Sequence, residues 1–209
     1  MMQHTPYDLI IIKKNIVPDK HIEELMLLTN NKEEITQATI INTDDDGNNS
    51  EKELLKNRNT LWYHIPEKEG NNLQVAISQM YARFVQPKYK CEFKRYEPAQ
   101  FLGYPVGGHY IEHNDAESFV EDKWTRVADR DVSFLFYLNS EFGGGELEFP
   151  ELGLTIKPKK GMMIAFPSYK EFVHKVHPVT WGHRYSLVCW VATQKNLYDT
   201  IPRPGIPKN

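Results

Sequence analysis

The distribution of apolar positions divides the chain into a helical first part and a second part built from short strands. Apolar residues recur every three or four positions over residues 22–28 and 73–84, which predicts two amphipathic helices. Pro18 suits the first turn of the first helix, and Pro87 is expected to end the second. The apolar run at residues 9–12 is too short to span a membrane or to form a signal-peptide core, so we interpret it as a strand.

From residue 91 onward the pattern of apolar residues changes from helical spacing to short runs. Short runs of β-branched and aromatic residues alternate with turn-forming residues, as in "DVSFLFYLN", "GMMIAFP" and "RYSLVCWVA". Repeated short strands between turns are typical of a β-sandwich or barrel. We therefore expect one domain over residues 1–209: helical support and a polar insertion in 1–90, a β core in 91–195, and an extended tail in 196–209.

The polar insertion covers residues 29–60, which are rich in Asn, Asp, Glu and Lys. This composition predicts a partly mobile excursion, either a lid over a substrate or a plain surface insertion. Residues 42–53 approach the spacing of an EF-hand calcium loop, but the first ligand would be the neutral Asn42 and the flanks are weak helices. We interpret this segment as a solvated acidic loop, and calcium binding there stays open.

Composition excludes some classes of function. The 209 residues carry a net charge of -3 and a pI of about 6.2, which provides no electrostatic footprint for nucleic acid or for an anionic membrane. The two cysteines, Cys91 and Cys189, are far apart and indicate no disulfide framework, so a reducing compartment is expected. We predict a cytoplasmic protein without a membrane segment, and its oligomeric state is not indicated.

The candidate chemistry begins in "YPVGGHYIEHND", where His113 and Asp115 are separated by one residue. On a strand these two side chains project from the same face, as two metal ligands would. A third ligand must come from elsewhere, and the candidates are His174, His177 and His183. Two histidines and one carboxylate form the facial triad of non-haem Fe(II) oxygenases. The pair alone is not specific, because a histidine beside a solvated aspartate gives the same pattern.

The segments around this pair carry further motifs in a fixed order. The pattern Y-x-x-G-x-x-Y-x-x-H-x-D is matched by Tyr104, Gly107, Tyr110, His113 and Asp115. "SFLFYLN" with "FGGGELEFPE" and then "IKPKKGMMIAFPS" follow, and "HKVHPVTWGHRYSLVCW" fits H-x-V-x-P-V-x-x-G-x-R. Over residues 91–192 the chain resembles the prolyl 4-hydroxylase-like 2-oxoglutarate/Fe(II) oxygenases.

The resemblance implies a fold. It is a double-stranded β-helix, a jelly roll of the cupin-like kind, within a mainly β, α+β domain supported by N-terminal helices. Gly107 and Gly108 would relax the backbone just before the metal pair. The residues expected in the core are Phe134, Phe136, Leu138, Phe149, Ile164, Phe166, Leu187 and Trp190.

The resemblance also implies roles for single residues. His174 is the third metal ligand, His177 points to the opposite strand face, and His183 is a turn residue. Arg184 holds the distal carboxylate of 2-oxoglutarate, because a guanidinium binds a carboxylate with two parallel hydrogen bonds. The further cosubstrate contacts that the resemblance suggests are Tyr104, Tyr137 and Ser186. His109 has no family role, and an ordinary structural position is expected for it.

The implied activity is a hydroxylation that depends on 2-oxoglutarate and O₂ and releases succinate and CO₂. The cofactors would be Fe(II), 2-oxoglutarate and O₂, with ascorbate left open. The favoured substrate is a peptidyl proline of a peptide or protein. Another protein residue or a small molecule would use the same chemistry, and a jelly-roll module that binds a ligand without catalysis is the third alternative.

Overall fold

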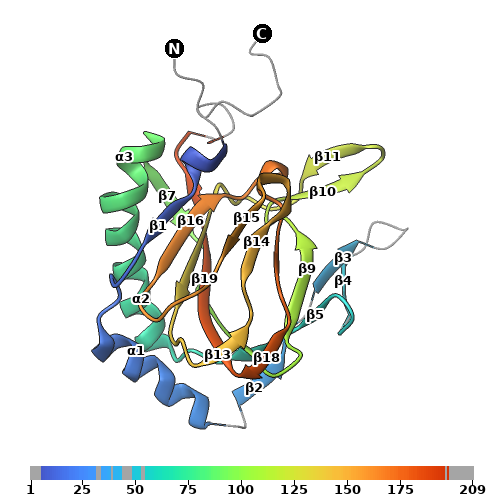
Figure 1. Cartoon of the computed structure of the whole chain (residues 1–209). Coiled ribbons are helices and arrows are strands. Elements are labelled where there is room, and N and C mark those ends of the chain that lie inside the picture. Colours follow the sequence, from blue (N-terminus) through green and yellow to red (C-terminus); the bar gives the residue numbers. More distant parts are fainter. Residues whose placement is uncertain are drawn as a thin grey trace.

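The computed structural model describes residues 6–31, 34–38, 40–43, 49–52, 55–195 and 197 of the chain. Two antiparallel sheets form the body, and helices cover the outer face of the larger one (Figure 1). The order of the larger, eight-stranded sheet is β1 (Ile11–Lys13), β16 (Met163–Pro167), β12 (Val132–Tyr137), β19 (Arg184–Thr193), β8 (Gln100–Tyr104), β6 (Leu61–Tyr63) and β2 (Ile35–Gln37), with β7 (Phe93–Tyr96) also paired to β19.

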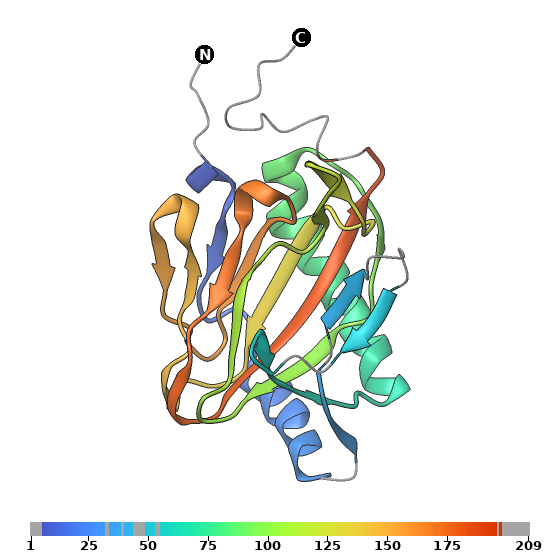
Figure 2. The ribbon, with the colours of Figure 1, turned by 90° about the vertical axis from the view of Figure 1, so that its right-hand side faces the viewer.

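A smaller sheet packs over the inner face of the larger one, as the turned view in Figure 2 shows. Its five strands have the order β15 (Leu154–Ile156), β14 (Leu147–Phe149), β17 (His174–Val176), β9 (His109–His113) and β5 (Arg58–Asn59). The remaining strands form pairs: β3 (Ile40–Thr43) with β4 (Asn49–Lys52), β10 (Glu117–Val120) with β11 (Lys123–Arg126), and β13 (Phe142–Gly144) with β18 (Val179–Gly182).

The helices come from the first part of the chain. They are α1 (Asp19–Met26), α2 (Glu67–Met80), a π-helical turn (Tyr81–Val85) and α3 (Gln86–Tyr89). Short 3₁₀ turns lie at Pro6–Leu9, Leu27–Asn30, Pro150–Leu152 and Lys170–Phe172. The helix predicted after Pro18 is confirmed, because α1 begins directly after this residue and buries Ile22 and Leu25.

The two faces of the large sheet have different partners. Alternate residues of a strand point to opposite faces. In β12, Phe134 lies on the helical side, with its ring 6.4 Å from that of Tyr81, whereas Leu135 lines an internal cavity. All six residues of β12 are buried, because the helices cover one face of the sheet and the small sheet covers the other.

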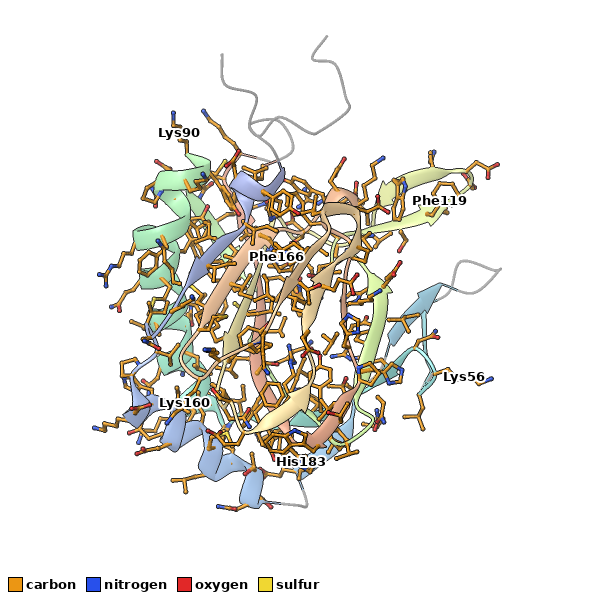
Figure 3. All side chains as sticks on the ribbon, in the orientation of Figure 1. Lys56, Lys90, Phe119, Lys160, Phe166 and His183 are labelled. Carbon is orange, nitrogen blue, oxygen red and sulfur yellow. The ribbon has the colours of Figure 1, made fainter. Side chains whose placement is uncertain are left out.

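The predicted jelly roll is confirmed, and so is its core. The eight residues expected there are all buried: Phe134, Phe136, Leu138, Phe149, Ile164, Phe166, Leu187 and Trp190. Figure 3 shows Phe166 inside the body, whereas Phe119 lies on the β10–β11 hairpin that projects from it. The hydrophobic core therefore lies between and behind the two sheets, and the hairpins lie outside it.

Two expectations for the first part of the chain are wrong. Pro87 does not end the helix, because the preceding π-helical turn places it in the first turn of α3, where its missing N–H is not needed. Residues 1–90 are also more than helical support: the strand expected at residues 9–12 is present as β1 and joins the large sheet, and β2, β6 and β5, which were not expected, join the two sheets as well. β2, β6 and β5 have two or three residues each, too few for a recognisable alternation of apolar and polar positions.

Part of the polar insertion lies outside the described residues, including Asp44, Asp46, Gly47 and Glu53 of the candidate calcium loop. Residues 40–43 and 49–52 form paired strands, with Thr43 opposite Asn49, and parts of both lie within the candidate loop. The calcium interpretation itself lies outside the described residues.

Candidate active site

Three metal-ligating side chains meet beside the inner face of the large sheet. His113 ends β9 and His174 begins β17, and the two residues are direct neighbours across these antiparallel strands. The Nε2 atoms of His113 and His174 lie 3.8 and 3.7 Å from the carboxylate oxygens of Asp115. One ligand atom from each of the three residues lies within 4.8 Å of the other two, so a single cation can contact all three.

The backbone fixes the orientation of both imidazole rings. The Nδ1–H of His113 donates to the carbonyl of Ile111 over 2.8 Å, and that of His174 donates to Phe172 over 3.0 Å. The proton is thus held on Nδ1, and the lone pair of Nε2 is directed toward Asp115. Tyr110 stacks on His113 with ring centroids 3.6 Å apart, which restrains the first ring further.

The carboxylate of Asp115 is held by residues that the motif does not contain. Ser133 Oγ donates to Asp115 Oδ2 over 2.6 Å and lies 2.8 Å from Ser168 Oγ. Arg130 Nη1 donates to the backbone carbonyl of Asp115 over 3.1 Å. Arg130 is itself fixed by two hydrogen bonds to Glu97, of 2.8 and 2.7 Å. Both ends of the aspartate are therefore positioned by strand β12 and the segment that precedes it.

The protonation states of the cluster suit metal binding. Burial lowers the pKa of His113 to about 3, and the neighbouring His174 acts in the same direction. Burial alone would raise the pKa of Asp115, but His174, His113 and the hydrogen bond from Ser133 outweigh it and hold this pKa below its usual range. At neutral pH the cluster thus presents a neutral imidazole and a carboxylate anion, as metal ligation requires.

A second polar centre lies at the start of β19, where Arg184 is completely buried. Its Nη1 donates to Ser186 Oγ over 3.2 Å, whereas Nε and Nη2 have no hydrogen-bond partner among the described residues. A buried guanidinium without an anion is costly, because the charge loses its hydration. The two free N–H edges therefore fit the carboxylate of a ligand.

Two tyrosines enclose this guanidinium. The Cζ atom of Arg184 lies 4.5 Å from the ring centroid of Tyr104 and 4.9 Å from that of Tyr137. The hydroxyl of Tyr137 is buried and has no hydrogen-bond partner among the described residues, and burial raises its pKa to about 12. Tyr137 can thus donate a hydrogen bond to the same ligand. The predicted contacts Tyr104, Tyr137 and Ser186 are all brought to Arg184.

A cavity of about 670 Å³ lies against the triad, and Tyr104, whose ring packs on the Arg184 guanidinium, forms part of its wall. Its walls include His113, Asp115 and His174 on one side, and Tyr104 and Trp190 on the large sheet. This volume is in the usual range for a ligand pocket. A metal held by the triad would therefore face this cavity, and Tyr104 is the wall residue that contacts the guanidinium.

The other predicted histidines lie elsewhere. His177 contacts Glu148, and His183 lies between β18 and β19 with its ring stacked on Tyr185. Both ring nitrogens of His109 bond to backbone carbonyls, at 2.9 Å from Gly107 and 3.1 Å from Lys56. These positions agree with the non-ligand roles expected for all three.

One glycine missed by sequence reasoning supports the guanidinium. Gly145 has φ +65°, and a Cβ at this position would lie 2.9 Å from Arg184 Cδ. A larger residue would therefore be strained and would also displace the arginine. The signals for the other missed residues were weak: Ser133 is one polar residue in the apolar run "VSFLFY", and Arg130 is one of many charged residues.

Comparisons with known proteins agree with this geometry. The model of the 2OG-Fe(II) oxygenase superfamily matches residues 99–192. This match covers slightly less than half of the chain. Prolyl 3-hydroxylase 2 of Mus musculus is 42% identical over 79 residues, which are 35% of this chain and 11% of that protein. The chain thus spans about a tenth of this curated relative.

Solved structures share the fold of the oxygenase domain. A prolyl-4-hydroxylase from Pseudomonas putida has a TM-score of 0.66 at 21% identity, over 90% of this chain and 94% of its own. A prolyl hydroxylase from Trichoplax adhaerens, in complex with a peptide fragment of the hypoxia inducible factor oxygen degradation domain, has a TM-score of 0.65 at 18% identity, over 93% and 88%. Such a family implies Fe(II), 2-oxoglutarate and O₂; the triad fits the metal, and the buried guanidinium fits a carboxylate. Among the described residues, the structure contains no helix long and apolar enough to cross a membrane.

Proposed function

We propose that this chain is a 2-oxoglutarate- and O₂-dependent hydroxylase that acts on peptidyl proline. The observation that carries the proposal is the cluster of His113, Asp115 and His174 at the cavity, together with the buried guanidinium of Arg184, which packs against Tyr104 in the cavity wall. A module that only binds a ligand has no need of both. The preference for a prolyl substrate rests on relatives and fold neighbours named prolyl hydroxylases, one of them in complex with a peptide.

The residues of the chain would divide the task between them. His113, Asp115 and His174 would hold Fe(II) through three protein ligands and leave other positions free. Arg184, with Tyr137 and Ser186 beside it, would bind the distal carboxylate of 2-oxoglutarate. Ser133 and Arg130 would keep Asp115 in its ligating orientation.

With these cofactors bound, the site would supply oxidative decarboxylation of 2-oxoglutarate to succinate and CO₂, with the second oxygen atom of O₂ inserted into a substrate C–H bond. The buried Tyr104 ring and Leu135 would supply an apolar wall to this cavity.

The experiment incubates the purified chain with Fe(II), 2-oxoglutarate, air and proline-containing peptides. We expect peptide-dependent succinate and a product heavier by one oxygen atom, both absent in Asp115→Ala. Amino-acid analysis of the product would distinguish 3-hydroxyproline from 4-hydroxyproline, since relatives of both kinds match the chain. Succinate formation without any modified peptide would instead favour a small-molecule substrate.

A further inference from the structure

The inner face of the large sheet continues beyond the cavity to the free edge of the sheet. Pairing registers place Tyr137 beside Ser186, Ser186 beside Leu102, Leu102 beside Trp62, and Trp62 beside Thr36. Directly paired residues on neighbouring strands project from the same face of a sheet. One row of side chains therefore runs from the cosubstrate contacts to edge strand β2.

The outer end of this row forms a second hollow, of about 310 Å³, lined by Glu34, Thr36, Trp62 and His64. Thr36 and Trp62 also line the main cavity, so the two spaces share a wall. Trp62 is 44% exposed even though it is flanked by the sheet on both sides. An exposed indole between two adjacent hollows is available to a ligand that lies across both.

The negative charge of Glu34 indicates which kind of ligand this hollow would bind. The carboxylate of Glu34 is exposed and forms no hydrogen bond or ion pair with the part of the chain that the structure describes. An indole face attracts a cation more strongly than other aromatic rings do. A carboxylate and an indole at the same hollow together favour the ammonium of lysine or the guanidinium of arginine.

The geometry points to a substrate subsite in which Trp62 and Glu34 bind a cationic side chain of the peptide. This inference rests on the proposed peptide hydroxylation and deepens it, because it names a feature of the substrate sequence. Three strand spacings separate β19 from β2, which is about 14 Å, or about four residues of extended peptide. The lysine or arginine would therefore lie about two to five residues from the hydroxylated position.

The test uses synthetic, fluorescein-labelled peptides with one central proline and one lysine moved through each flanking position, each matched by a glutamine peptide. Anisotropy titrations with Fe(II) and 2-oxoglutarate under anaerobic conditions measure binding without turnover. We expect one lysine position to bind about five- to thirtyfold more tightly than its glutamine counterpart, and this advantage to shrink in high salt.

The variants assign the effect to the subsite. Glu34→Gln should reduce the lysine advantage while the affinity for the glutamine peptide stays the same, and Trp62→Leu should reduce the ratio of the lysine-peptide affinity to the glutamine-peptide affinity. Glu34→Lys should reverse the preference, so that a peptide with glutamate at this position binds more tightly than the lysine peptide. Glu67→Gln on α2 and Trp181→Leu on β18 are matched controls, since both are exposed outside these hollows, and they should keep the advantage.

Failure of the subsite and failure of the proposed function give different results. If peptides are bound and hydroxylated but no lysine position differs from glutamine, or if the advantage persists in Glu34→Gln, the subsite is wrong and the function stands. If no peptide binds although 2-oxoglutarate does, the peptide substrate and the subsite are both overturned.

Discussion

A buried guanidinium with two unpaired edges is the most unusual single residue of this chain. Arg184 is fully enclosed by protein, and its nearest aromatic neighbours, Tyr104 and Tyr137, carry no formal charge. Its cost to the folded state is recovered only when an anion binds. On the proposed role of Arg184, the stability of the free protein and its affinity for the cosubstrate are therefore opposed at this residue.

Substitution of Arg184 tests this opposition. Arg184→Ala should weaken 2-oxoglutarate binding about tenfold to a thousandfold, and Arg184→Lys should recover part of it, because an ammonium lacks the planar fork. Arg184→Met should leave the melting temperature of the cosubstrate-free protein unchanged or raise it. Anaerobic titration of the Fe(II)-loaded variants, followed by the absorption of the iron chelate, measures the affinity. The exposed Arg95, paired with Asp129, is the control, and Arg95→Ala should change neither property.

Substitutions of Asp115 and of Ser133, which holds it, should have different effects on turnover and on iron affinity. Asp115→Ala removes the anionic ligand and should abolish Fe(II)-dependent turnover with the fold retained. Ser133→Ala keeps all three ligands but removes the 2.6 Å hydrogen bond to Asp115, so iron affinity should fall about ten- to a hundredfold. Competition with a fluorescent chelator measures this affinity. Ser78→Ala on the surface of α2 is the control, and an equal loss in that variant would contradict the positioning role of Ser133.

At the scale of elements, the β10–β11 hairpin begins directly after the metal-ligand motif, and Asn114 within that motif holds its first residues. Asn114, between two of the metal ligands, accepts hydrogen bonds from the backbone N–H groups of Ala116 and Glu117, at 3.3 and 2.6 Å. Glu117 in turn accepts from the N–H of Lys170 over 2.6 Å. This turn connects the metal site mechanically to the projecting hairpin.

Asn114→Ala should therefore loosen the hairpin and the metal site together. Loss of the side-chain acceptor leaves two backbone donors without it and should cost about 1 kcal/mol. We expect faster amide hydrogen exchange over residues 117–126 and weaker iron binding. Faster exchange with unchanged iron affinity would show that the hairpin moves independently of the ligands. Asn71→Ala, in the middle of α2, is a control for the loss of an asparagine.

At the scale of the whole molecule, the cofactors should add to stability because they bind only the folded state. At a hundred times its dissociation constant a ligand contributes about 2.7 kcal/mol, which for a domain of this size corresponds to an increase of about 5–10 °C in melting temperature. Scanning calorimetry with Fe(II), and then with Fe(II) and 2-oxoglutarate, should show two increments. Arg184→Met should lose the second increment and keep the first, whereas Asp115→Ala should lose both.

The residues of the candidate site were easier to predict from the sequence than the residues that support them or the short strands at the edge of the sheet. The triad could be predicted because His113 and Asp115 share a strand face by local geometry, and the motif order added His174 and Arg184. Ser133 and Arg130 could not be predicted, because their contacts depend on which strands pair and in which register. Strand β2 could not be predicted for a related reason. It has three residues, too few to show a strand pattern, and it forms only by pairing with β6 at the edge of the large sheet.

The inner row of the large sheet joins the segment that matches the family with strands that lie outside the match. Tyr137, Ser186 and Leu102 lie within residues 99–192, whereas Trp62 and Thr36 lie outside them. On the proposed subsite, substitutions in the outer strands should change the preferred peptide sequence without altering any proposed ligand of the metal or the cosubstrate. Grafting residues 34–64 onto a related domain is therefore a direct route to transferring selectivity.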